Sequence, residues 1–273
     1  MEKFSVSMCV YGGDNPQWFV TAVDSVLNQT AQPDEIVLVV DGPVPEELGK
    51  IIGQYKENSI FNVIQLERNM GHGEARRTGL RACQNDLVAI MDADDISVPD
   101  RFARQLAKFA EQPELTIVGG VIEEFVGTPD NVVGKRTVFA EDAAIKQDMK
   151  KRCPMNQVTV MFRKSGVDAV GGYVDWNSEE DYYLWLRLML GGAVFANIPE
   201  NLVCVRVGKE MYQRRGGWKY FRSEAKLQHW MLRNKVIGVG TYIVNVTKRL
   251  IVQVLLPNRL RSWVFQKFAR KPV

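Results

Sequence analysis

The chain has 273 residues, 46% of them hydrophobic and 25% charged, so it can bury a large core as one extended domain or a domain with an appendage. This composition excludes a disordered chain. The net charge of +3 conceals an asymmetry, because residues 211–273 hold fourteen Lys and Arg against one acidic residue, Glu224. The basic end predicts an anionic partner, and charge alone does not choose between membrane lipid and nucleic acid.

The cysteines and the apolar segments bound the cellular location. The four cysteines lie far apart without a C-x-x-C pair, and only His72 and His229 could complete a zinc site with them, so a reduced, cytoplasmic chain is the simplest interpretation. The N-terminus lacks the apolar core and cleavage site of a signal peptide. The apolar run over 236–256 contains Asn245, Lys248 and Arg249, so it fails as a membrane-spanning helix.

Short apolar runs alternate with helical repeats through the first third of the chain. We expect strands at 6–11, 35–40, 63–66 and 86–91, and helices at 17–27, 48–55 and 73–83. This alternation predicts a parallel, doubly wound α/β sheet with right-handed crossovers.

The alternation continues after residue 98 and becomes less regular from about residue 127. Pro99 suits the start of a helix whose buried face carries Phe102, Leu106 and Phe109. Beyond it we expect strands or strand fragments at 115–121, 132–133, 138–139 and 158–162, and helices at 143–149, 181–190 and 220–233. Basic and apolar residues alternate over the last forty positions, which predicts amphipathic helices on a surface.

Three carboxylates, Asp92, Asp94 and Asp95, follow the apolar run at 87–91. Ligands in open α/β sheets bind at the carboxyl ends of strands. Crowded carboxylates raise one another's pKa unless a cation or strong hydrogen-bond donors offset them. The pattern therefore predicts a divalent metal ion that binds a phosphate.

Known motifs narrow this prediction. An EF-hand is excluded because Ile96 and Ser97 stand where its loop needs Asp or Asn and then Gly. A haloacid-dehalogenase-like phosphohydrolase using Asp92 and Asp94 is disfavoured by Ile96 and by the position on a fourth strand. The D-x-D of nucleotide-sugar glycosyltransferases remains, with Mn²⁺ or Mg²⁺ against a diphosphate. The alternative is an acidic turn that caps the helix near Pro99.

Six segments in order carry a family resemblance: 10–11, 25–30, 35–42, 69–71 with 75–76, 92–95 and 180–182. Over about residues 4–220 the chain resembles the family 2 glycosyltransferases of the GT-A fold, particularly bacterial members that build capsule, exopolysaccharide and O-antigen. The resemblance implies a Rossmann-like, mostly parallel sheet with a mixed acceptor-side region and C-terminal amphipathic helices. It divides the chain into a nucleotide-sugar-binding half (1–125), an acceptor-side catalytic half (126–210) and a basic helical tail (211–273).

The resemblance also implies donor-binding roles. Tyr11 would stack beside the nucleobase and Asp41 would accept its imide N–H, while Asn69 and Arg76 would lie near the nucleotide. The Asp92-Ala93-Asp94 segment would hold the diphosphate through a metal ion bound by Asp94 with help from Asp92, and Arg214 and Arg215 would close over it. Each assignment has an ordinary alternative. Tyr11 would be a strand aromatic, Asp41 a turn residue, and Asn69 and Arg76 surface polar groups. The Asp92-Ala93-Asp94 segment would be an acidic turn, and Arg214 and Arg215 the solvated start of a basic helix.

For catalysis the resemblance selects Asp181 as the base that deprotonates the acceptor hydroxyl, with Glu180 as second choice. A helix start capped by Ser178 would leave the same sequence pattern. Gln157 stands where relatives often carry His, and an amide cannot titrate near neutral pH. Arg77 replaces a common Asn, which affects one local contact.

The implied activity is an inverting, metal-dependent transfer of a hexose from a nucleotide sugar, UDP-linked by preference, to a sugar hydroxyl on a polyprenyl-diphosphate-linked acceptor. The basic helices would then bind the inner face of the cell membrane peripherally. A non-catalytic nucleotide- or nucleic-acid-binding protein would also explain the basic tail. No nucleic-acid module accompanies it, so we expect no nucleic-acid partner.

Overall fold

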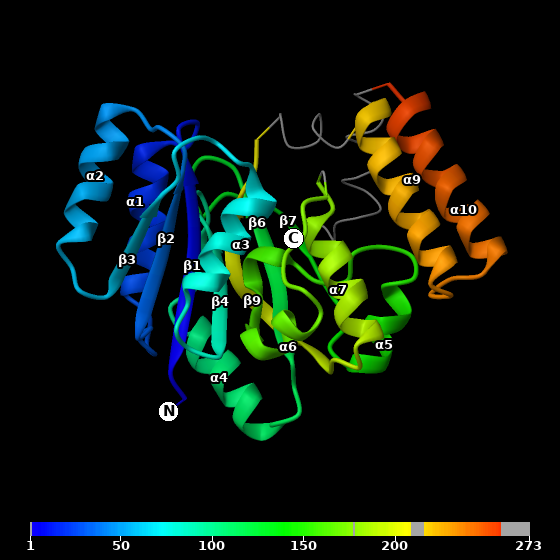
Figure 1. The fold of residues 1–273 in the computed structure, drawn as a ribbon, viewed down its shortest axis with the longest axis horizontal. Coiled ribbons are helices and arrows are strands. Elements are labelled where there is room, and N and C mark those ends of the chain that lie inside the picture. The colour runs from blue at the N-terminus through cyan, green and yellow to red at the C-terminus, as the bar shows by residue number, and fades with distance from the viewer. Residues whose placement is uncertain (1, 177, 209–215, 258–273) are drawn as a thin grey trace.

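The computed structural model describes residues 2–176, 178–208 and 216–257 (Figure 1). Their strands form a mixed sheet in the order β3-β2-β1-β4-β8-β6-β9-β5, and β7 pairs with β6. The strands are β1 (Phe4–Tyr11), β2 (Glu35–Asp41), β3 (Phe61–Gln65), β4 (Leu87–Asp92), β5 (Ile96–Ser97), β6 (Ile117–Phe125), β7 (Val132–Arg136), β8 (Met161–Arg163) and β9 (Phe195–Arg206). The helices are α1 (Pro16–Leu27), α2 (Glu46–Lys56), α3 (His72–Ala82), α4 (Arg101–Glu111), α5 (Asp142–Asp148), α6 (Lys164–Ala169), α7 (Glu180–Leu190), α9 (Trp218–Arg233) and α10 (Val239–Leu250), with short turns η1 (Gln157–Thr159) and η2 (Ile251–Leu255).

The first half is the predicted parallel sheet. β1 pairs in parallel with both β2 and β4, and β2 with β3. In this register Tyr11 lies opposite Asp41, and Cys9 lies opposite Asp92. Because parallel strands end at one edge, the polar residues that close β1, β2 and β4 share that edge.

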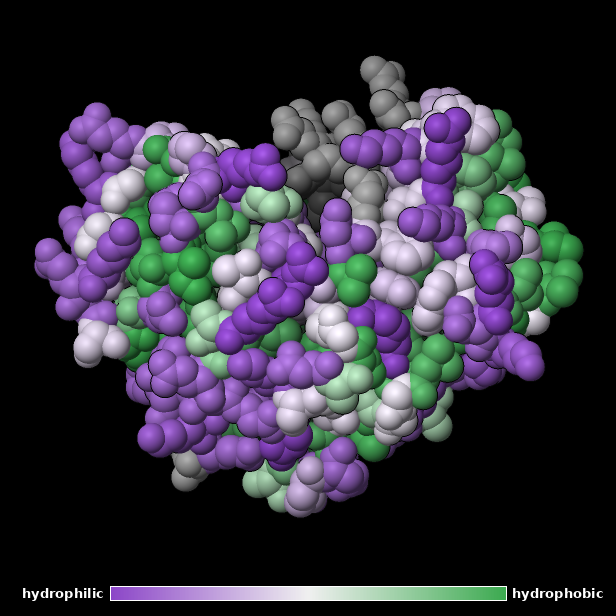
Figure 2. All heavy atoms as spheres, viewed as in Figure 1, coloured by the Kyte–Doolittle hydropathy of each residue, from purple (hydrophilic) through white to green (hydrophobic). Residues whose placement is uncertain are grey.

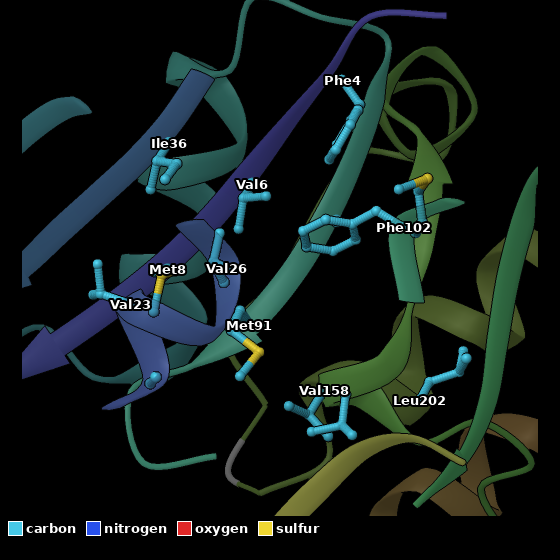
Figure 3. Packing of buried hydrophobic residues seen from close by; sticks show 14 of the residues in the cluster. Phe4, Val6, Met8, Val23, Val26, Ile36, Met91, Phe102, Val158 and Leu202 are labelled. Atoms are coloured by element: carbon cyan, nitrogen blue, oxygen red, sulfur yellow. The ribbon is translucent and has the colours of Figure 1, made fainter. Parts of the chain in front are cut away.

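Both faces of this sheet are covered, as the apolar runs predict. Alternate residues of β4 divide between the faces: Leu87, Ala89 and Met91 join a cluster with α1, α2 and α4, and Val88 and Ile90 join one with α3, α7 and α9. Figure 3 shows part of the first cluster, where side chains of β1, β4, α1 and α4 converge. A two-sided core of this kind fixes the position of the strand ends.

The second half is mixed, and it corrects several predictions. β8 is antiparallel to β4 and β6, whereas β6 runs parallel to β9. The strand expected at 158–162 is reduced to β8 because η1 is a 3₁₀ turn, and 138–139 is not a strand. The twelve-residue β9 was not expected, because Pro199 interrupts its apolar pattern where the register shifts.

Two helix starts also differ from prediction. β5 separates the acidic cluster from α4, which begins at Arg101 rather than near Pro99, so the cluster does not cap that helix. At α7 the residue preceding the helix is Glu179, which makes no side-chain capping bond, and Ser178 has a φ of 64°. Ordinary serine capping therefore does not explain this helix start.

The C-terminal amphipathic helices are confirmed as far as residue 257. α9 and α10 run side by side and pack beside α7, at the opposite end of the molecule from α2 (Figure 1). Leu227 and Met231 of α9 are buried in the same cluster as α7. Among the helices of the described residues, none is long and apolar enough to cross a membrane.

Candidate active site

One arginine joins the acidic strand end to the start of α7. Arg76, buried on α3, donates to Asp92 (3.2 Å) and to Glu180 (2.8 Å). Burial alone would lower the pKa of Arg76, but the two carboxylates more than offset it and hold the pKa above its ordinary value. Two segments 88 positions apart in sequence, at Asp92 and Glu180, therefore meet across a single guanidinium.

The acidic cluster is larger than the sequence motif. Asp14, in the loop after β1, has its pKa raised to about 6 by burial and by the nearby carboxylates of Asp94 and Asp92. The pKa of the buried Asp95 is raised well above its usual range by desolvation and by the same two neighbours. The sequence analysis missed Asp14, although its place just beyond the end of β1 is a usable signal.

Arg206, at the end of β9, fastens the cluster to the second half. Its backbone N–H donates to the Asp95 carboxylate (2.9 Å) and its Nε to the Asp94 carbonyl (3.2 Å). The guanidinium also lies over the rings of Trp18 and Phe125. Asp95 is therefore engaged in positioning the turn, and the missed strand β9 explains why sequence reasoning overlooked Arg206.

A second buried arginine lies behind β4. Arg101 is fully buried and donates to the Ile90 carbonyl (2.8 Å) and to Gln105 (3.1 Å). Burial lowers the pKa of Arg101 to about 9, and Asp92 opposes that shift. Arg101 thus places a positive charge inside the core behind the strand that ends at Asp92, a feature that the sequence analysis did not identify.

Asp41 closes β2 and organises the loop that precedes α3. Its carboxylate accepts from the backbone N–H groups of Met70 (2.6 Å) and Gly71 (3.0 Å). The Asn69 side chain donates to the Asp41 carbonyl (3.4 Å). Asp41 is buried and holds this loop in place, and its remaining lone pairs can accept a hydrogen bond from another donor.

Tyr11, on the adjoining strand end, is 41% exposed. Its ring lies over Gly13, where an added Cβ would come within 2.6 Å of ring atoms. The ring is thus presented to solvent at the edge that Asp41 shares, as a stacking surface requires.

The first turn of α7 supplies two carboxylates in different environments. Glu180 is paired with Arg76; burial and Asp181 raise its pKa, and Arg76 offsets part of that rise. Asp181 is half-buried, accepts from the Tyr182 N–H (2.6 Å), and lies 4.0 Å from the Cys153 thiol. Asp181 thus contacts a backbone N–H and a thiol, whereas Glu180 is bound to a guanidinium.

Gln157 lies beside this helix start without a titratable function. Its amide donates to the Tyr173 hydroxyl (2.7 Å), and its buried Oε1 has no hydrogen-bond partner among the described residues. Burial raises the pKa of Tyr173. The pair therefore adds polar groups beside the start of α7.

The residues at the acidic edge fit a divalent cation whose coordination is completed by a substrate. Among the described residues no three His, Cys, Asp or Glu side chains converge in a metal-binding arrangement. Mg²⁺ and similar ions are commonly held by one or two carboxylates together with phosphate oxygens and water. Burial and, after it, the carboxylates of Asp94 and Asp92 raise the pKa of Asp14, and a bound cation would offset the negative charge of these carboxylates.

The structure brings most of the predicted site residues together, at the sheet edge and at the start of α7. Tyr11, Asp41, Asp92 and their neighbours come together at one sheet edge, and Arg76 connects that edge to Glu180 and Asp181. Arg214 and Arg215 lie outside the described residues.

Comparison with known proteins identifies the family. Residues 5–171 match the family model "Glycosyl transferase family 2". An uncharacterized glycosyltransferase of Haemophilus influenzae is 38% identical over 98% of this chain and all of its own length. The Escherichia coli UDP-Gal:alpha-D-GlcNAc-diphosphoundecaprenol beta-1,3-galactosyltransferase is 35% identical over 98% of this chain and 97% of its own, and the Erwinia amylovora amylovoran biosynthesis glycosyltransferase AmsE is 34% identical over 97% and 98%.

Solved structures agree on the fold. S. aureus TarS (residues 1–349) in complex with UDP-GlcNAc superposes with a TM-score of 0.66 at 14% identity, covering 97% of this chain and 79% of that one. Full-length TarS gives 0.61 at 16% identity, and this chain spans 48% of its length. The GT-A fold expected from the sequence is confirmed. The chain is an enzyme of glycosyl transferase family 2.

Proposed function

We propose that this glycosyltransferase moves a hexose, with inversion, from a UDP-linked donor to the hydroxyl of a sugar carried on polyprenyl diphosphate, in the synthesis of a surface polysaccharide. The observation that carries the proposal is the Arg76 bridge between Asp92 and Glu180. It places the carboxylates suited to a donor diphosphate next to a helix start suited to activating an acceptor. The names of the E. coli and E. amylovora relatives support the lipid-linked acceptor and the polysaccharide pathway.

The donor would lie along the edge formed by β1, β2 and β4, within the half that comprises residues 1–125. Tyr11 would stack on the base, Asp41 would accept the imide N–H with a lone pair not used by its loop, and Asn69 would contact the nucleotide. Asp92, Ala93 and Asp94 would face the diphosphate. Arg214 and Arg215 remain candidates for closing over it.

Asp94, aided by Asp92, would hold Mn²⁺ or Mg²⁺, and Asp14 would add negative charge beside it. When bound, such an ion supplies Lewis-acid stabilisation of a departing diphosphate. Arg76 would keep Asp92 correctly oriented, because it donates directly to that carboxylate.

Asp181 would accept the proton of the acceptor hydroxyl, on the side of the sugar opposite the leaving group, which produces inversion. Glu180 would orient the site through its bond to Arg76. In this scheme residues 126–210 form the acceptor side of the same domain.

A transfer assay tests the proposal. The purified full-length chain should consume a UDP-sugar in the presence of a lipid-linked or soluble sugar acceptor, and GDP- or dTDP-sugars should react much more slowly. Excess EDTA should abolish transfer and added Mn²⁺ or Mg²⁺ should restore it. Undiminished transfer in EDTA would refute the metal assignment, and equal use of all donors would refute the UDP assignment.

The lipid-linked acceptor also gives the C-terminal helices a proposed role. Five apolar side chains of α10 and η2 are 44–65% exposed: Val239, Ile243, Val244, Ile251 and Leu255. This apolar ridge appears as the green surface over α10 in Figure 2. The neighbouring helix α9 and the turn that follows it carry exposed basic residues: Lys219, Arg222, Arg233 and Lys235.

Such a surface suits peripheral binding to an anionic membrane at the cytoplasmic face, with about 1 kcal/mol from each basic residue near the lipid. Full-length protein should float with vesicles containing anionic lipid, and Ile243→Glu with Val244→Glu should weaken flotation at least tenfold. Thr241→Glu, at an exposed polar position of α10, is the matched control. Equal flotation of all three proteins would contradict the proposed surface.

A further inference from the structure

The helices that carry the apolar ridge also reach the first turn of α7 through buried polar side chains. Gln228, Asn245 and Gln253 are each at most 5% exposed, although they lie on helices at the molecular surface. Asn245 donates to Gln228 (2.8 Å), and Gln253 donates to Glu224. Buried polar groups are retained where their partners must be held in one arrangement, so the target of this network matters.

Arg249 lies at the centre of the network. Its Nε is 2.8 Å from Oε2 of Glu224 on α9, and both side chains are 13% exposed. Its Nη2 donates to the carbonyl of Lys151 (3.1 Å), in the loop after α5. Arg249 therefore ties α10, α9 and the loop at 150–153 together.

That loop leads directly to the proposed catalytic base. Three successive carbonyls over 149–151 accept side-chain hydrogen bonds, from Tyr182 of α7, from Asn245 (2.9 Å) and from Arg249 (3.1 Å). Two residues later, the Cys153 thiol lies 4.0 Å from Oδ2 of Asp181. A displacement of Arg249 would therefore be transmitted to the surroundings of Asp181.

A second connection runs through Glu179, which precedes α7 and is 4% exposed. Its carboxylate accepts a hydrogen bond from the Tyr220 side chain. Burial raises the pKa of Glu179 most, and the charges of Glu224 and Asp181 raise it further. The positive charge of Arg249 lowers it. Arg249 is thus the positive charge among three carboxylates at the junction of α7 with α9 and α10. Without Arg249, Glu179 and Glu224 would repel each other and Asp181, the proposed base.

We propose that Arg249 is a positioning residue: through Glu224 and the loop at 150–153 it fixes the first turn of α7 and hence Asp181. This inference rests on the proposed function, because it takes Asp181 as the base. Arg249 touches neither the acidic strand end nor Arg76 in any described contact, so its effect falls on the acceptor side.

The experiment compares Arg249→Met with Lys248→Met in the full-length enzyme, assayed with a soluble acceptor and no membrane. Both variants remove one positive charge from α10, but Lys248 is exposed. Arg249→Met should lower kcat about 10- to 100-fold with the donor KM unchanged, because small misplacements of a catalytic group cost about that much. Lys248→Met should stay within about twofold of the parent.

Two further variants separate positioning from loss of folding. Arg249→Lys should recover part of kcat, because an ammonium can still reach Glu224. In an Asp181→Asn background Arg249→Met should cost little more, since residues that act through one group are strongly non-additive. Equal losses with and without Asp181, a raised donor KM, or an unaffected kcat would overturn the inference.

The same variants distinguish a failure of the positioning role of Arg249 from a failure of the proposed base. If Asp181→Asn lowers transfer while Arg249→Met does not, only the positioning role fails. If Asp181→Asn transfers sugar at nearly the parental rate, the proposed base is wrong.

Discussion

The two sides of the candidate site are built differently. On the donor side, Tyr11, Asp41 and Asp92 stand at the ends of adjacent parallel strands, so sheet register alone brings them together. On the acceptor side, we propose that Asp181 depends on a helix start held in place by the loop at 150–153 and by Arg249 from α10. The donor edge should therefore tolerate changes in the C-terminal helices, whereas the acceptor side should not. Arg76 is the contact that both sides share.

Removing this shared contact should have the largest effect on stability. Arg76→Met leaves Asp92 and Glu180 without their common partner, and breaking a buried ion pair from one side costs about 3–5 kcal/mol. We expect the free energy of unfolding to fall by about 3 kcal/mol, because the Asp92 side chain is 38% exposed and its charge is partly screened. Denaturant unfolding measures it, together with a loss of transfer.

Arg77→Met is the matched control for that change. Arg77 is the next residue of α3, and its ion pair with Glu74 is local and more exposed. Its loss should cost about 1 kcal/mol or less. Equal destabilisation by the two variants would show that Arg76 does not join the two sides.

A change confined to the donor side comes next. Gly42 follows Asp41 with a φ of 86°, and an added Cβ would lie 2.4 Å from the Asn69 nitrogen. Gly42→Ala should therefore destabilise the fold by about 1–3 kcal/mol and weaken donor binding. Gly53→Ala, in α2 where an added Cβ meets nothing within 4 Å, should be neutral or stabilising. Unchanged stability and donor KM in Gly42→Ala would remove the proposed link between this loop and the nucleotide.

The smallest expected effect is on pH dependence at the acidic edge. The pKa of Asp14 is about 6 in the folded protein, against an ordinary value of 3.8. Between these values the folded protein keeps a proton that the unfolded chain has lost, so stability falls as pH rises through that window. Asp14→Asn should flatten this part of the pH profile of Tm, measured in EDTA, while Asp24→Asn at an exposed position should not. A profile unchanged by Asp14→Asn would contradict the raised pKa of Asp14 that burial and the neighbouring carboxylates cause.

Much of the donor side was predictable from sequence because its information is local. The strands, their order of appearance and the acidic cluster at the end of β4 follow from apolar runs and the residues that stop them. Asp14 was missed because it stands three positions beyond its strand, inside a loop.

The acceptor side was harder to predict because its contacts are long-range. β9 is interrupted at Pro199, the Asp95 carboxylate accepts from Arg206, 111 positions later, and the loop beside Asp181 accepts from Arg249, 98 positions beyond Lys151. The start of α7 resembled ordinary serine capping in sequence, yet Ser178 adopts a positive φ and the cap makes no side-chain bond. Such arrangements depend on tertiary packing, which periodicity does not encode.

The central claim is that Asp181 takes the proton of the acceptor. Single-turnover transfer by Asp181→Asn, with donor binding measured in parallel, tests it most directly. We predict a rate about 10²- to 10⁴-fold below the parent with donor affinity and Tm unchanged, because the amide keeps the shape of the carboxylate but cannot accept the proton. Transfer at nearly the parental rate by the folded variant would contradict the account.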